Sequence, residues 1–492
     1  MRKAFVGLLV TLIALVVLAV GVLLLANWND EPLSDKSRKA LTYTAPTENQ
    51  LRGNGFLVLA GIDAPAPVNP KADAVEPARQ LGQQILVREI ERWKWNQRLG
   101  HTNHANAPKP LAPTSALTRK QILPDELRCP PEQADCIAWF VQRRKQFATP
   151  DAHQRAVLSR LANIARAPYC TNVLPNFVAA QGAPYSALFA GFELQLARAS
   201  LLWNDKAYGE ALDLLERGEA VRQCTGASDR LNAGSLATSS MNHATIKWLS
   251  NAITRTGDRM RPQDEARIQK LLETLRISIR RGLAAEMTYS ASIAHSLGVT
   301  LKLPSNADEG EGNATENELS KSDSWIRHAR RSVNALLYLP NQTINIITER
   351  WTPLVQLADV PPPELKTAEE SASDKRESLE EAHAQWHGAR NPIGNHLLGI
   401  TDLSDYVHCI HRAIDTDGYR RLALLQLQAM QQRVAPEKMS QWLADRPEPL
   451  RNPWDNQPMQ WNTESGTLEF TGLAVQTANP DKSRTYRISL RR

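Results

Sequence analysis

The sequence lacks the short motifs that mark common catalytic and cofactor-binding sites. It contains no Gly-x-Ser-x-Gly nucleophile elbow, no phosphate-binding Walker loop and no dinucleotide-binding glycine fingerprint. The Cys-x-x-Cys spacing that is typical of zinc sites is also missing. These absences predict no catalytic residue, no cofactor and no metal site, and they leave an enzymatic activity uncertain.

The sequence has no strong excess of charge of one sign. Lys and Arg number 58 against 52 Asp and Glu, which gives a net charge of +6. The basic clusters at 143–145 and 327–331 lie in helical patterns beside acidic or apolar residues. This arrangement is typical of solvated helix faces and disfavours a nucleic-acid-binding stripe, so we predict no nucleic-acid partner.

Long apolar runs are absent from all but the first 28 residues. Arg2 and Lys3 precede an apolar stretch from Ala4 to Ala26, which Trp28 and several polar residues end. About 20 apolar residues are enough to cross the roughly 30 Å hydrocarbon core of a bilayer. Residues 1–28 therefore predict one transmembrane signal anchor, and Trp28 suits the membrane interface.

A cleaved signal peptide is the alternative interpretation of this run. The stretch exceeds the usual 7–15 apolar residues, and Leu24 occupies the position where a small residue is expected before cleavage after Ala26. No cysteine follows the run, which excludes a lipoprotein anchor. The flanking Lys and Arg residues are nearly balanced, but acidic residues dilute those after the helix. We therefore expect a bitopic inner-membrane protein whose large domain is periplasmic.

The five cysteines allow two disulfides. Cys129 and Cys136 enclose a short proline-containing loop, while Cys170 and Cys224 lie at the ends of consecutive helical patterns. Such pairing is typical of an oxidising compartment and agrees with export. The alternative is five buried thiols in a cytoplasmic domain. Cys409 is left over, on an apolar helical face where a core thiol is expected.

The hydrophobic periodicity predicts a mainly α fold: an anchor helix, stacked α-hairpins and a small C-terminal β-hairpin. The patterns at 186–203 and 206–224 resemble one tetratricopeptide unit. That unit's usual turn glycine and a second copy are absent, so a plain αα-hairpin is the alternative. Further helices are predicted at 76–98, 135–149, 151–166, 235–254, 263–283, 285–300, 323–350 and 403–433, and strands at 459–461, 467–470 and 486–490.

Composition divides the chain into five predicted parts. They are an anchor (1–28), a spacer (29–53), a helical exported domain (54–359), a linker (360–378) and a C-terminal α+β module (379–492). The linker prediction follows from three consecutive prolines and a polar stretch rich in Ser, Glu and Lys. The apolar run at 54–65 fits a strand or a buried helical turn, because periodicity does not separate the two over so short a length.

Three groups of side chains are candidates for chemistry. Glu286 with Glu273, and Asp402 with Asp405, are pairs of acids that would need a shared pocket for hydrolytic catalysis. His408 and His411 lie three residues apart on a predicted helix, with Asp405, Tyr406 and Cys409 nearby. A His-x-x-His pair without an adjacent Glu is a weak metal motif, and helix-face charges or caps explain the acids more simply.

The C-terminal part carries one family resemblance. Asn391-Pro-Ile-Gly-Asn395 is followed by a predicted helix containing Arg421-Leu-Ala-Leu424, by Asn452-Pro-Trp-Asp-Asn-Gln-Pro-Met-Gln-Trp461, and by a hairpin. This order resembles a segment of uncharacterised single-anchor bacterial envelope proteins. In those proteins Asp is usual where this chain has Asn452, and Tyr is usual where it has Trp461. The resemblance implies an envelope location and a shared small fold, but no known activity.

A similar turn closes the globular head of type II secretion pseudopilins, but their methylation signal, Gly-Phe-Thr-Leu-Ile-Glu, is absent from residues 1–30. From the anchor, the cysteines and the missing chemistry we expect the exported helical domain to bind another envelope component, most simply a protein, in a scaffold or assembly role. The alternative is an enzyme that acts on cell-envelope material.

Overall fold

The structure is a computed structural model. It describes residues 2–69, 72–100, 107–111, 116–130, 133–178, 180–226, 234, 236–276, 278–302, 333–384, 390–400, 403–473 and 484–490. The protein is 70% helical, with 19 α-helices in the described ranges and a small three-stranded antiparallel sheet near the C-terminus. The predicted mainly α fold is confirmed.

The elements follow one another along the chain with short connections. The α-helices are α1 (Arg2–Ala26), α2 (Asp35–Leu41), α3 (Glu48–Leu51), α4 (Gly55–Ala60), α5 (Val75–Leu99), α6 (Arg119–Ile122), α7 (Cys136–Gln142), α8 (Arg144–Ala148), α9 (Ala152–Arg166), α10 (Tyr185–Asn204), α11 (Tyr208–Gly226), α12 (Leu236–Thr256), α13 (Pro262–Thr274), α14 (Arg280–Lys302), α16 (Pro340–Leu357), α17 (Leu365–Ala384), α18 (Pro392–Gly399), α19 (Ser404–Gln431) and α20 (Met439–Ala444). The 3₁₀ turns are η1 (Asp125–Leu127), η3 (Gly257–Arg259), η5 (Pro362–Glu364), η6 (Pro436–Lys438) and η7 (Glu448–Leu450), and the strands are β1 (Gln460–Asn462), β2 (Thr467–Thr471) and β3 (Thr485–Ser489).

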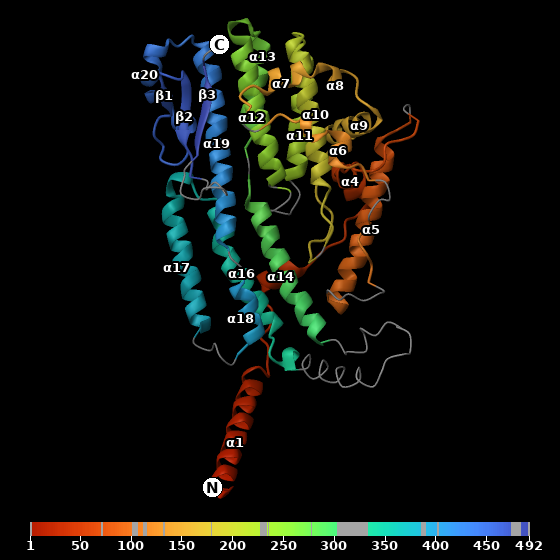
Figure 1. Ribbon diagram of the computed structural model, residues 1–492, viewed down its shortest axis with the longest axis vertical. Coiled ribbons are helices and arrows are strands. Elements are labelled where there is room, and N and C mark those ends of the chain that lie inside the picture. The colour runs from red at the N-terminus through yellow and green to blue at the C-terminus, as the bar shows by residue number, and fades with distance from the viewer. Residues whose placement is uncertain are drawn as a thin grey trace.

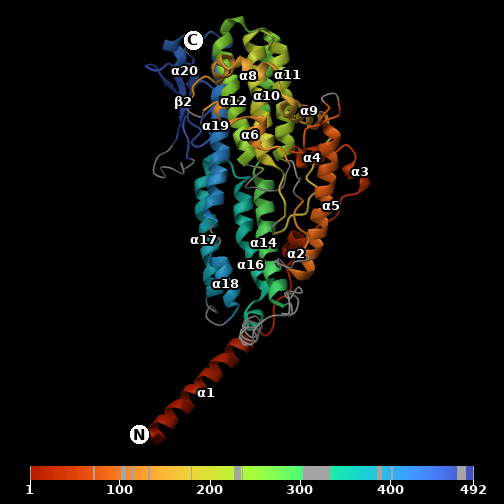
Figure 2. The same cartoon turned by 45° about the vertical axis from the view of Figure 1, so that its right-hand side comes forward.

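Helix α1 projects away from the rest of the molecule in both views (Figures 1 and 2). Its apolar stretch Val6–Ala26 has a mean hydropathy of 3.2, and none of it is buried inside the protein. Among the described residues it is the one helix long and apolar enough to cross a membrane. It is compatible with a single-pass anchor or a signal sequence.

Two hydrophobic clusters form the body of the molecule. The cluster nearer α1 is built from α14, α16, the start of α17, α18 and the first half of α19, with Trp351 fully buried. The second cluster lies farther from α1 (Figure 1) and contains helices between α4 and α13, the second half of α19 and the sheet. Helix α19 has 28 residues and is about 42 Å long at 1.5 Å per residue, so it reaches both clusters.

The predicted αα-hairpin is present as α10 and α11. The side-chain amide of Gln195 on α10 donates a hydrogen bond to the Leu214 carbonyl on α11. In the turn between the helices, Lys206 has a φ of 63°, in the left-handed region that usually favours glycine. The predicted hairpin thus forms without the glycine typical of a tetratricopeptide turn.

The C-terminal strands form an antiparallel sheet in the order β1-β2-β3. Trp461 pairs with Leu468, and Phe470 pairs with Tyr486, whose ring stacks on it at 4.9 Å between centroids. A Cβ atom at Gly418 would lie 2.4 Å from the Phe470 ring, so only glycine there lets the sheet approach α19 this closely. The predicted hairpin and third strand are confirmed.

Several boundaries differ from the sequence predictions. The run at 54–65 forms a buried helix, α4, and not a strand. The predicted helix 263–283 ends at Thr274, where Arg222 donates to the Thr274 and Arg276 carbonyls. Residues 360–378 are not a flexible linker, because they contain η5 and most of α17. The two hydrophobic clusters also divide the chain differently from the predicted boundary between 359 and 379.

Candidate functional site

The segment directly after α1 is docked onto the body of the protein. The sequence predicted residues 29–53 to be a polar spacer, yet they contain α2 and α3. The Asp30 carboxylate accepts hydrogen bonds from the backbone amides of Asn341 and Gln342, at 2.8 and 3.0 Å. These amides belong to the first turn of α16, whose N–H groups have no partner within the helix. Asp30 therefore caps α16 from a distant part of the chain.

The C-terminal end of α1 is held by the residues before α18. Arg390 donates to the Ala26 and Asn29 carbonyls at 2.9 and 3.1 Å. The Asn391 amide donates to the buried Asn27 side chain at 2.6 Å. A guanidinium beside the last carbonyls of a helix also complements the negative end of its dipole. The anchor helix thus has a defined attachment to the body.

Helix α2 continues this docking along α16. Asn345 donates to the Glu31 carboxylate and accepts from the Ser34 amide. The buried hydroxyls of Ser37 and Thr348 lie 2.9 Å apart. Because polar contacts join the first residues after α1 to one face of α16, this junction fixes how the body is presented relative to the anchor.

A cavity of about 980 Å³ lies in the half of the molecule away from α1. Its walls come from α7, α10, α12, α19, the residue before β3 and β3 itself, together with the loop closed by Cys129 and Cys136. Phe140, Phe189 and Trp248 form apolar parts of the lining, and Ser239 and Ser240 contribute hydroxyls. A volume of this size suits a drug-sized ligand or a short stretch of another chain.

Positive side chains outnumber negative ones around this cavity. The cations are Arg128, Lys247, Arg412 and Arg484, and the carboxylates are Asp125 and Glu193. Arg128 binds Glu193 through two hydrogen bonds of 2.6 and 2.9 Å. Asp125 lies 3.2 Å from Arg119 and 3.9 Å from Lys120. Both carboxylates are therefore neutralised locally, and the remaining potential is positive.

His243 on α12 also lines the cavity. Its ring stacks on Tyr419 of α19 at 4.9 Å between centroids. Burial, and then the nearby charges of Arg484 and Lys247, lower the pKa of His243 to about 4. The imidazole is therefore neutral at neutral pH, because the surroundings disfavour a further positive charge.

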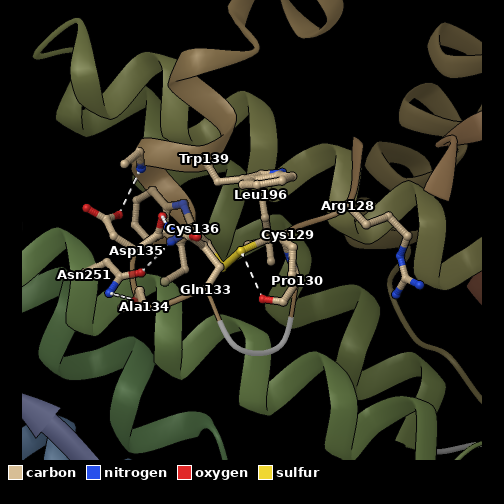
Figure 3. Close-up of a disulfide and its surroundings, with 12 residues drawn as sticks. Arg128, Cys129, Pro130, Gln133, Ala134, Asp135, Cys136, Trp139, Leu196 and Asn251 are labelled. Atoms are coloured by element: carbon tan, nitrogen blue, oxygen red, sulfur yellow. Dashed lines mark hydrogen bonds between the residues drawn. A yellow bond between two sulfur atoms is a disulfide. The ribbon is translucent and has the colours of Figure 1, made fainter. Parts of the chain in front are cut away.

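Both predicted cysteine pairs lie at disulfide distance. The Cα atoms are 5.6 Å apart for Cys129 and Cys136, and 5.1 Å apart for Cys170 and Cys224. Figure 3 shows the first pair closing the loop before α7. Asn251 of α12 accepts from the Cys136 amide and donates to the Ala134 carbonyl, both at 3.1 Å. The first disulfide therefore holds one wall of the cavity against α12.

The histidine pair proposed as a metal site does not gather a set of ligands. The His408 and His411 rings are 6.1 Å apart, and His411 forms a 2.7 Å hydrogen bond with Glu369 of α17. Asp405 is exposed. No group of three or more His, Cys, Asp or Glu side chains suited to a metal ion occurs within the described ranges.

The candidate acids occupy different environments. Glu286 is buried and accepts a 3.3 Å hydrogen bond from Tyr406, whereas Glu273 is exposed and accepts one from Gln269. Asp402 lies outside the described residues. Burial raises the pKa of the Cys409 thiol, which disfavours the reactive thiolate. Tyr406 thus joins Glu286 to α19, a packing role.

The sequence analysis missed the buried carboxylate of Asp415. It accepts hydrogen bonds from Trp454 Nε1, the Leu473 amide and the Tyr486 hydroxyl, at 2.8, 3.1 and 3.3 Å. Trp454 belongs to the turn that carries the family resemblance, and Asn452 accepts from the Trp454 amide at 3.2 Å. The turn therefore closes the C-terminal sheet onto α19, which gives this motif a structural role.

Comparison of the chain with known family models, curated proteins and solved structures found no match. The resemblance to single-anchor envelope proteins therefore stays a prediction based on the residues of the C-terminal segment. The case for a function must come from the anchor, its junction and the charged cavity.

Proposed function

We propose that this chain is a single-pass protein of the bacterial inner membrane whose helical domain is exported and binds another envelope component. The observation that carries the proposal is the unburied apolar helix α1 docked by its C-terminal end onto the body. A hydrophobic helix of this length exposed to water would be costly, whereas a bilayer satisfies it.

The docking of the junction favours an anchor that is retained. Helix α1 extends to Ala26, and the Ala26 carbonyl accepts a hydrogen bond from Arg390. A signal peptidase requires an accessible segment with small residues at its cleavage site, and Leu24 does not fit this requirement. The two cysteine pairs support export, since disulfides persist in oxidising compartments.

The cavity supports a binding role for the exported domain. It lies in the half of the molecule away from α1, so the bilayer would not block it. Its walls offer cations, hydroxyls and apolar side chains, but the candidate catalytic acids Glu286 and Glu273 are not among its lining residues. A scaffold or assembly role accounts for these features without requiring catalysis.

Site-specific photo-crosslinking in cells tests this proposal. A photoreactive phenylalanine analogue is placed in the full-length chain at Ser240, which is exposed at the cavity, or at Val87 of α5 as a control. We expect Ser240 to yield one dominant adduct with an envelope protein and Val87 to yield none. A chain that forms no adduct at either position would contradict the proposed binding role.

A further inference from the structure

We infer that the cavity beside the Cys129–Cys136 disulfide binds an acidic segment of the partner protein. This inference rests on the proposed function and names the chemistry by which the partner is recognised. The occupant we propose is a stretch of chain with several Asp or Glu side chains, which enters between α12, α19 and the residue before β3.

The charge of the cavity carries the first step. Its carboxylates, Glu193 and Asp125, already have cationic neighbours. Arg412 and Arg484 form no ion pair with any described residue, and Arg484 lies 4.9 Å from the centre of the Tyr486 ring. Arginine presents a planar fork of donors that matches a carboxylate, so two such side chains with Lys247 form a receptor for acidic groups.

The placement of the cations carries the second step. Lys247 comes from α12, Arg412 from α19 and Arg484 from the residue before β3, so they stand on separate walls of the cavity. Its volume of about 980 Å³ is large for a single anion. Several carboxylates spread along a peptide satisfy separated cations better than one compact oxyanion does.

The environment of His243 agrees with this charge pattern. The histidine remains neutral near neutral pH partly because Arg484 and Lys247 already place positive charge at this wall. A bound carboxylate would offset that charge. The same cations that disfavour a proton on His243 therefore attract an acidic segment.

Fluorescence anisotropy with a labelled hexaglutamate peptide tests the inference on the full-length protein in nanodiscs of zwitterionic lipid. We expect saturable binding that weakens with added salt. The double variant Arg412→Ser/Arg484→Ser should lower the affinity at least about tenfold. The control Arg217→Ser/Arg259→Ser removes the same charge from exposed positions outside the cavity and should retain the affinity.

A charge-reversed variant separates a loss of recognition from a loss of folding. Arg412→Glu/Arg484→Glu should reject hexaglutamate and begin to bind hexalysine, because an unfolded cavity would not exchange one preference for the other. Equal hexaglutamate binding by the wild type and the serine double variant would overturn the inference. Failure of hexaglutamate to bind while inorganic pyrophosphate binds through the same arginines would also overturn it, in favour of a phosphate ligand.

These results are distinguishable from failure of the proposed function. A protein adduct at Ser240 without hexaglutamate binding would leave the partner proposal standing and remove its acidic character. Hexaglutamate binding without any protein adduct in cells would keep the cavity's preference for acidic groups and remove the envelope partner.

Discussion

Among single residues, His243 links the charge of the cavity to the stability of the fold. Its ordinary pKa of 6.5 falls to about 4 in the folded protein, through burial first and then through Arg484 and Lys247. Between these values the unfolded chain takes up a proton that the folded chain refuses. The free energy of unfolding therefore falls as the pH falls from 6.5 to 4, and rises as the pH rises.

We predict that His243→Gln reduces this pH dependence. The contribution removed is about 3 kcal/mol between the two ends of the window. Urea unfolding of the full-length protein in detergent, at several pH values from 6.5 to 4, measures it. Burial also lowers the pKa of His295, so some pH dependence should persist. An unchanged slope in the variant would show that His243 is not the source.

The cavity residues illustrate what sequence patterns miss at this scale. Arg412, Lys247 and Arg484 come from different elements and are far apart in the chain, so no spacing connects them. The turn at Asn452 was predictable, because its local backbone hydrogen bonds follow from Asn and Pro. That Trp454 reaches Asp415 depends on tertiary packing, which local chemistry does not encode.

At the scale of elements, regular apolar periodicity made most helices predictable. Residues 151–166 and 403–433 were predicted as helices and form α9 and α19 with ends shifted by no more than two residues. Helix α17 was missed because its buried stripe is narrow. Leu365 is its one fully buried large side chain, and the small Ala368 and Ala372 supply the rest of the contact. A polar composition with few large apolar residues looks like a linker.

The two cysteine pairs give a prediction at the same scale. They close loops with sequence separations of 7 and 54 residues. By the chain-entropy relation, losing the bridge costs about 2.5 kcal/mol for the short loop and about 4 kcal/mol for the long one. We therefore expect Cys170→Ser/Cys224→Ser to be the less stable of the two double variants in urea unfolding. The reverse order would show that local packing around Cys129–Cys136 outweighs loop entropy.

At the scale of the whole molecule, the junction after α1 determines how the body is presented. Asp30 caps α16, Asn27 accepts from Asn391, and α19 reaches both hydrophobic clusters. The anchor was predictable from an apolar run alone, whereas its docking was not. Residues 29–53 look like a polar spacer because their partners lie some 300 positions further along the chain.

The central claim is that α1 remains attached and the body lies outside the cytoplasm. The most direct test places a cysteine at exposed Val87 in a Cys409→Ser background and treats spheroplasts with a membrane-impermeant maleimide. The account predicts the same labelling before and after lysis, on a protein whose intact mass includes residues 1–26. Labelling that appears only after lysis, or a mass that lacks those residues, would contradict it.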